Sequence, residues 1–216
     1  MSLRERYPGA DILAQRGHWD DATRRVVMDR VQNTPDFRYF DDHQRATLEA
    51  LCARVIPQTH RPPDRREPLA PWIDARCAGG HGDGFRFDDM PSNEQAWTWA
   101  LDGLDQTARA LFGPQACFKD LDAHQQDQVL ERVRRGDPPG EIWRRLPAQR
   151  WWVFVALRQI TGVYYAHPFA WDEIGFGGPA YPRGYFALNS GYPEPWEPRE
   201  VGEQAQRSLR PRWRYP

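Results

Sequence analysis

The chain has 216 residues, of which 40% are hydrophobic, so it can bury one sizeable core and is expected to form one domain. Its 29 basic and 30 acidic residues give a net charge of -1, so the sequence lacks the basic surface typical of proteins that bind nucleic acid or anionic membranes. Cys52, Cys77 and Cys117 show no CxxC spacing, which predicts free, mostly buried thiols rather than a disulfide framework or a thiolate metal site.

The N-terminal residues, MSLRERYPGADILAQRG, contain neither an apolar segment nor a twin arginine that would indicate an export signal. We therefore expect the chain to be cytoplasmic, or to become periplasmic by export together with a partner.

Apolar periodicity predicts helices throughout the first part of the chain. A short helical turn is expected around 11–15, followed by a helix over 20–32 in which three valines form one apolar stripe. The stripe consists of Val26, Val27 and Val31. The clearest amphipathic helix begins after Asp41, an expected N-cap, and ends at Pro57. A short helix with Leu69, Trp72 and Ile73 follows.

The middle of the chain predicts two longer helices and the centre of the core. One helix runs from about Pro91 to Gly113, and the next from Asp122 to Gly136, with a single helical turn around Trp143. The stretch over 151–165 is hydrophobic on nearly all sides, which predicts a buried central helix that pairs with the helix over 91–113. The central helix is too short and too polar in places for a membrane span.

No segment shows the alternating pattern of a strand, so the fold is predicted to be all-α. We expect a single helical domain of about six helices over 1–188, with a long irregular loop near its end. Residues 189–216 are predicted to form an extended tail rich in proline and tryptophan, whose tryptophans lie along a surface of this chain or of another.

The segment over 167–185 combines glycines, prolines and large aromatic residues, which predicts an irregular loop rather than a helix or strand. Its aromatic side chains must pack either on the chain's own helices or on a partner protein. The predicted partner interface consists of His167, Phe169, Trp171, Phe176, Gly177, Gly178, Tyr181, Arg183, Tyr185 and Trp196. Trp171 and Phe176 are the expected anchors, and Gly177 and Gly178 are expected to adopt positive φ angles.

The sequence predicts no catalytic residue, no cofactor-binding residue and no metal ligand on this chain. The six histidines form no HxxxH or HExxH pair, and GFGGP over 175–179 neither follows a predicted strand nor opens a helix. Asp172 and Glu173 could serve as an acid and a base, but capping a turn or pairing with Arg183 is the more common role for such residues.

Four segments together resemble the gluconate 2-dehydrogenase subunit 3 family. They are RYPGADIL, WDDATRRVVMDRV, FDDHQRATLEALCARVIPQ and YYAHPFAWDEIGFGGPAYPRGY. The resemblance implies a cofactor-free small subunit whose partner is an FAD-binding large subunit of the glucose-methanol-choline type. The flavin, the catalytic histidines and the sugar or polyol site would belong to that partner, and a cytochrome c subunit or another acceptor would take the electrons. Many members carry a twin-arginine signal on this subunit, and this sequence shows none.

Two functions of other classes remain open at this stage. A stand-alone carbohydrate-binding module would use exposed tryptophan and tyrosine faces to stack on sugar rings. A hydrolase would use Asp172, Glu173 or His167.

Overall fold

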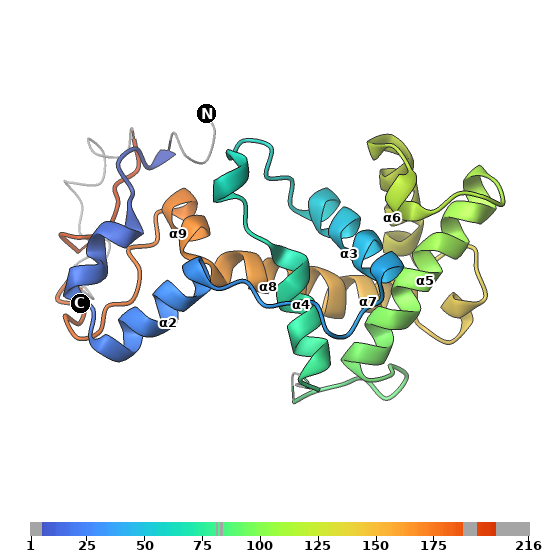
Figure 1. The fold of residues 1–216 in the computed structure, drawn as a ribbon, viewed down its shortest axis with the longest axis horizontal. Helices are drawn as coiled ribbons and strands as arrows, with labels where there is room; N and C mark the ends of the chain where they lie inside the picture. Colours follow the sequence, from blue (N-terminus) through green and yellow to red (C-terminus); the bar gives the residue numbers. More distant parts are fainter. Residues whose placement is uncertain (1–5, 81, 83, 188–193, 202–216) are drawn as a thin grey trace, which may run out of the picture. The chain divides into compact units, whose positions relative to one another are not determined.

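The computed structural model describes residues 6–80, 82, 84–187 and 194–201, and all regular structure within these ranges is helical, as predicted. The chain forms two compact units (Figure 1). Unit 1 combines residues Met1–Asn33 with Tyr165–Pro216, and unit 2 consists of Thr34–Tyr164. Of the predicted tail over 189–216, only 194–201 falls within the described part of the chain.

Unit 1 contains the 3-10 helix η1 (Ile12–His18), α2 (Asp21–Gln32) and α9 (Pro168–Ile174). The prediction for α2 is confirmed, and η1 continues three residues beyond the predicted turn. Val27 is buried, whereas its neighbour Val26 is 57% exposed. The predicted valine stripe is therefore wrong at Val26, because adjacent residues of a helix point about 100° apart.

The helix α9 corrects the prediction of an irregular loop over 167–185. Pro168 occupies the first turn, where a missing backbone N–H costs no hydrogen bond. The Nδ1 atom of His167 accepts a hydrogen bond from the backbone N–H of Phe169 at 3.2 Å and caps the helix. Gly175, at φ 68°, ends it in the left-handed conformation. The residues that were expected to break a helix instead mark its two ends.

Unit 2 contains the predicted helices close to their predicted boundaries. They are α3 (Asp42–Val55), α4 (Leu69–Ala78), α5 (Asn93–Phe112) and α6 (Ala123–Arg135), with the 3-10 turns η2 (Pro63–Arg65), η3 (Phe118–Asp120) and η4 (Ile142–Arg144). Asp41 caps α3, as expected. Asp122 and Gln125 form a capping box at α6, and Gly136 ends that helix at φ 81°.

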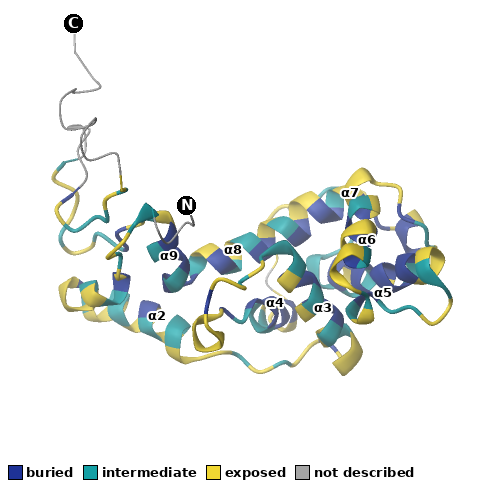
Figure 2. Cartoon of the chain, turned by 90° about the horizontal axis from the view of Figure 1, so that it is seen from above, coloured by how far each residue is buried: buried dark blue, intermediate teal, exposed yellow. Residues whose placement is uncertain are grey.

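The central helix is one continuous run of three segments. These are α7 (Ala148–Trp151), the π-helical η5 (Trp152–Leu157) and α8 (Arg158–Ala166). The ring of Trp151 meets that of Trp97 on α5 edge to face, with centroids 5.5 Å apart. The indole N–H of Trp97 donates to Gln159 at 2.8 Å, so the buried polar group has a partner. Buried residues run along α5 (Figure 2), and α5 contacts both α7 and η5, which confirms the predicted pairing.

The segment that leads into α3 is fixed by one buried carboxylate on α4. Asp74 is fully buried and accepts hydrogen bonds from three successive backbone N–H groups at 2.7 to 3.1 Å. The donors are Arg38, Tyr39 and Phe40. Charge-assisted hydrogen bonds of this kind are stronger than neutral ones, so Asp74 positions the start of α3.

The central helix is not buried on all sides, which corrects the sequence prediction. Val153 and Phe154 are 44% and 48% exposed. The helices α5 and α6 pack against η5, and these two side chains lie outside the covered part of its surface. No helix within the described ranges is both long and apolar enough to cross a bilayer. Cys52, Cys77 and Cys117 are free thiols, the first two buried, as predicted.

Replacing Gly103 of α5 with alanine should lower the melting temperature. The new Cβ would lie 2.7 Å from Cζ2 of Trp143, and overpacking a rigid core typically costs about 1–3 kcal/mol. Gly162 of α8 is the matched control, because a Cβ there meets nothing within 4 Å. Gly162→Ala should stabilise the protein by about 0.5–1 kcal/mol through helix propensity. Equal thermal shifts for the two variants would contradict this packing.

Candidate partner interface

The first part of the predicted interface packs inside unit 1. Ile12, Trp19 and Val27 form a buried apolar cluster, and Trp171 of α9 packs against it. The Trp171 indole N–H donates to the carbonyl oxygen of Tyr165 at 2.7 Å. Of the two predicted alternatives for the aromatic segment, packing on the chain's own helices therefore applies to Trp171.

The candidate acid and base residues of this segment also serve the local structure. One carboxylate oxygen of Asp172 accepts from the backbone N–H of Ile12 at 2.7 Å and so ties α9 to η1. The N-cap of η1 is Asp11, so Asp172 binds the backbone of a distant segment, while Arg183 donates to Gln15 at 3.0 Å. Glu173 is buried, and His167 caps α9. The hydrogen bonds of Asp172 and His167 give these two residues structural roles that need no hydrolase function.

The two glycines of the predicted interface are required for different reasons. Gly178 adopts φ 77°, as predicted, and a Cβ there would overlap the side chain of Ile12. Gly177 does not have a positive φ, so that prediction is wrong. Gly177 is instead confined by its neighbours, because a Cβ would lie 2.9 Å from Cγ of Glu197.

Residues 194–197 pack along the loop that follows α9. The guanidinium carbon of Arg183 lies 4.3 Å from the ring centroid of Trp196, and the ring of Tyr185 lies 6.5 Å from it on centroids. Glu194 accepts from the backbone N–H of Ala187 at 2.5 Å. Trp196 therefore lies along a surface of its own chain, one of the two arrangements expected for the tail tryptophans.

Four aromatic residues of the same loop remain at the surface. Their exposed fractions are 39% for Phe176, 66% for Tyr181, 47% for Tyr185 and 82% for Phe186, and we call them the exposed loop aromatics. Phe176 leans edge to face on Trp171, with centroids 5.4 Å apart. Phe169 is half-buried beside His167. The predicted interface thus divides into an internally packed set and an exposed set, which Phe186 joins although it was not predicted, and contact with a partner stays a prediction for both sets.

Unit 2 carries a second exposed aromatic group that the sequence interpretation missed. Phe85, Phe87 and Phe154 stack edge to face in a row, with centroids 5.1 and 4.8 Å apart, and Phe85 is 65% exposed. The Arg150 guanidinium lies 4.6 Å from the Phe87 ring centroid and also pairs with Asp89. The sequence does contain a signal for this group. Phe85 and Phe87 directly follow a glycine-rich stretch, so their apolar side chains lie outside any predicted helix and could be expected at the surface.

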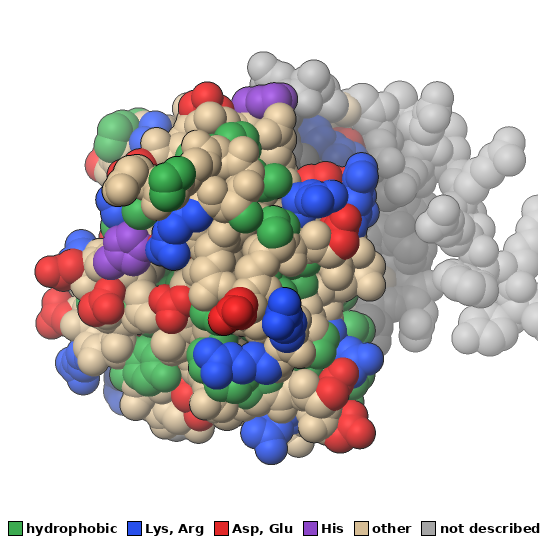
Figure 3. Space-filling view, turned by 90° about the vertical axis from the view of Figure 1, so that its right-hand side faces the viewer, with side chains coloured by type: hydrophobic (Ala, Val, Ile, Leu, Met, Phe, Trp, Pro, Cys, Tyr) green, Lys and Arg blue, Asp and Glu red, His purple; other side chains and the backbone are tan. Residues whose placement is uncertain are grey.

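The face of unit 2 that carries α5 and α6 offers no comparable surface. Basic and acidic side chains are interspersed across it, and hydrophobic side chains show only in small separate groups (Figure 3). A mixed surface of this kind is typical of solvent-exposed faces and favours no single class of charged ligand.

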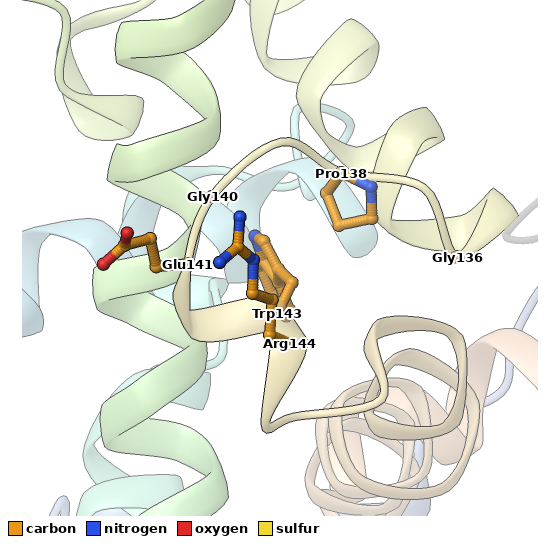
Figure 4. A pocket seen from close by; sticks show the side chains of 6 residues that line it. All are labelled: Gly136, Pro138, Gly140, Glu141, Trp143 and Arg144. Atoms are coloured by element: carbon orange, nitrogen blue, oxygen red, sulfur yellow. The ribbon is translucent and has the colours of Figure 1, made fainter.

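A shallow pocket of about 410 Å³ lies beside η4. Its lining consists of Gly136, Pro138, Gly140, Glu141, Trp143 and Arg144. The Trp143 indole N–H already donates to Thr107 at 3.0 Å, and Glu141 points away from Arg144 (Figure 4). Binding sites for small molecules need polar groups that converge on the ligand, so this pocket does not have the features of one.

Within the described ranges, one group of side chains has the composition of a metal site: His43, Asp105 and Cys117. The sequence predicted no metal ligands, because these residues come from three separate segments without motif spacing.

Comparisons with known proteins give one match. A family model described as gluconate 2-dehydrogenase subunit 3 matches residues 42–178, which is more than half of the 216-residue chain. No curated protein and no solved structure matches the chain. The matched region begins at the first residue of α3 and ends at Gly178.

Substituting Gly178 with alanine should destabilise unit 1 more than the same change at Gly184. Both glycines adopt a positive φ, 77° and 75°, where a Cβ costs roughly 1–2 kcal/mol. Only Gly178→Ala adds an overlap with Ile12, because the space around Gly184 is open. Limited proteolysis and thermal melting should therefore show a larger loss for Gly178→Ala, and equal losses would mean that the loop does not pack on η1.

Proposed function

Because the chain belongs to the gluconate 2-dehydrogenase subunit 3 family, we propose that it is the non-catalytic small subunit of an FAD-dependent sugar or polyol dehydrogenase. The family match is the observation that carries this proposal. The partner would be a large subunit of the glucose-methanol-choline type, which holds the flavin and the substrate site. A cytochrome c subunit is the proposed further partner for electron transfer.

The side chains of unit 1 support an accessory role. Asp172 and His167, two of the three candidate residues for a hydrolase, accept hydrogen bonds from backbone N–H groups of the chain itself. The aromatic residues at the surface, by contrast, are of the types that are enriched where proteins bind one another.

The exposed loop aromatics are the proposed contact with the large subunit. Their backbone is held in place by neighbouring packed residues, since Trp171 lies against the apolar cluster and Arg183 lies over Trp196. A surface that is already ordered loses less conformational entropy on binding than a flexible one. Tyr181 and Phe186 are the most exposed members, so a partner could bury most of their area.

A carbohydrate-binding module is the second candidate, favoured by the exposed rings of Tyr181 and Tyr185, which are suited to stacking on sugars. The two functions differ in what the isolated chain binds. A module binds glycans by itself, whereas a small subunit needs its flavoprotein.

Co-expression with a large subunit of this type should give a stable complex that carries FAD. The isolated chain should show no flavin absorption and no dehydrogenase activity, because no motif in its sequence supplies a flavin site. Size-exclusion chromatography with absorption spectra checks both statements. Glycan binding by the isolated chain together with failure to bind any such flavoprotein would overturn the proposal.

Alanine substitution of Tyr181 or Phe186 should weaken the complex while leaving the chain folded. Truncating a large aromatic residue at the centre of an interface to alanine typically costs about 2 kcal/mol or more of binding free energy, which raises Kd roughly 30-fold. The melting temperature should hardly change, because both side chains are mainly exposed. The matched control is Phe85→Ala, a similarly exposed phenylalanine of unit 2. If only Phe85→Ala weakens binding, the contact lies on unit 2 and the proposed interface is wrong.

A further inference from the structure

Three potential metal ligands meet in unit 2. His43 lies in the first turn of α3, Asp105 lies in the middle of α5, and Cys117 directly precedes η3. Their ligand atoms all lie within 4.8 Å of one another. The group therefore joins three segments that are separate in the sequence.

Asp105 is oriented as a metal-binding carboxylate would need to be. The residue is 2% exposed, and its Oδ1 atom accepts from the backbone N–H of Phe118 at 2.8 Å. The Oδ2 atom makes a short hydrogen bond with Nε2 of His43, so a metal ion that binds both atoms would displace the proton of that bond. One oxygen is thus held by a backbone N–H group, as ligating carboxylates commonly are, while the other lies within reach of the His43 imidazole.

The donor set matches the preferences of Zn²⁺. Imidazole nitrogen, carboxylate oxygen and thiolate sulfur all bind zinc, at about 2.0–2.3 Å, so tetrahedral donors lie about 3.3–3.8 Å apart. Donors within 4.8 Å can reach that spacing through small rotations of the His43 and Cys117 side chains. One carboxylate and one thiolate would also neutralise a divalent cation, which reduces the cost of the buried charge on Asp105.

Cys117 is better placed for this role than the other two cysteines. Burial raises the pKa of the Cys77 thiol to about 12 and raises the pKa of the Cys52 thiol as well, so both resist ionisation. Cys117 is half-buried. The side chain of His43 is 44% exposed, which gives an ion access from solvent.

We propose that His43 Nε2, Asp105 Oδ2 and Cys117 Sγ bind one Zn²⁺ ion, with water in the fourth position. Binding needs the lone pair on Nε2, so His43 must keep its remaining proton on Nδ1, and Cys117 releases its thiol proton to solvent. The ion cross-links α3, α5 and η3 and so stabilises the folded state of unit 2. This inference does not depend on the proposed function.

The test uses the full-length chain, stripped with a chelator and titrated with Co²⁺ as a spectroscopic probe. The wild-type chain should bind one equivalent and show a thiolate-to-cobalt charge-transfer band in the near ultraviolet, which Zn²⁺ abolishes by displacement. At free Zn²⁺ about 100-fold above Kd, the melting temperature should rise by roughly 5–10 °C.

Two ligand variants and one control decide the outcome. Cys117→Ser should abolish the charge-transfer band, and His43→Gln should weaken binding by more than about 100-fold, beyond the effect usual for outer-shell partners. His124→Gln, at an exposed histidine of α6, should change nothing. Circular dichroism checks folding, and Cys117→Ser keeps the test decisive if His43→Gln fails to fold. Absence of the band in the wild type, or its persistence in Cys117→Ser, would overturn the proposal.

Discussion

The contact between Trp97 of α5 and Trp151 of the central helix is the interaction on which unit 2 depends. Two large aromatic side chains are fully buried there, and the Trp97 N–H is satisfied by Gln159. Other sides of α5 also make buried contacts. Gly103 leaves room for the Trp143 indole, and Asp105 makes hydrogen bonds to His43 of α3 and to Phe118 of η3. The π-helical segment η5 is covered only in part, and Phe154 is 48% exposed.

In unit 1, α9 and the loop after it contribute both buried residues to the core and exposed aromatic residues to the surface. Trp171 and Gly178 pack on η1 and its neighbours, and Asp172 fixes the start of η1 through a backbone N–H. A few residues further on, Phe186 is 82% exposed. These contacts hold the start of the loop against η1, and under the proposed function a surface ordered in this way would lose less conformational entropy on binding a partner.

The sequence predicted the helix ends that are set by local capping residues, and it missed the features that depend on tertiary packing. Helix boundaries at Asp41, Asp122 and Gly136 follow from capping preferences that act within one turn, and all three were predicted correctly. The helix α9 was missed because Pro168 and Gly175 were interpreted as helix breakers, although each is well tolerated at a helix end. Periodicity could not show that part of the central helix would lack a covering neighbour. The group of His43, Asp105 and Cys117 arises only from tertiary packing, so no spacing in the sequence indicates it.

The central claim is that this chain acts by binding a flavoprotein through the loop after α9. Hydrogen exchange of the chain, measured alone and in complex with an FAD-dependent large subunit, tests this claim most directly. Amides of residues 176–187 should become protected in the complex, while those of α5, already enclosed in unit 2, should exchange at the same rate in both states. A stable complex with unchanged exchange over 176–187, or no complex at all, would contradict it.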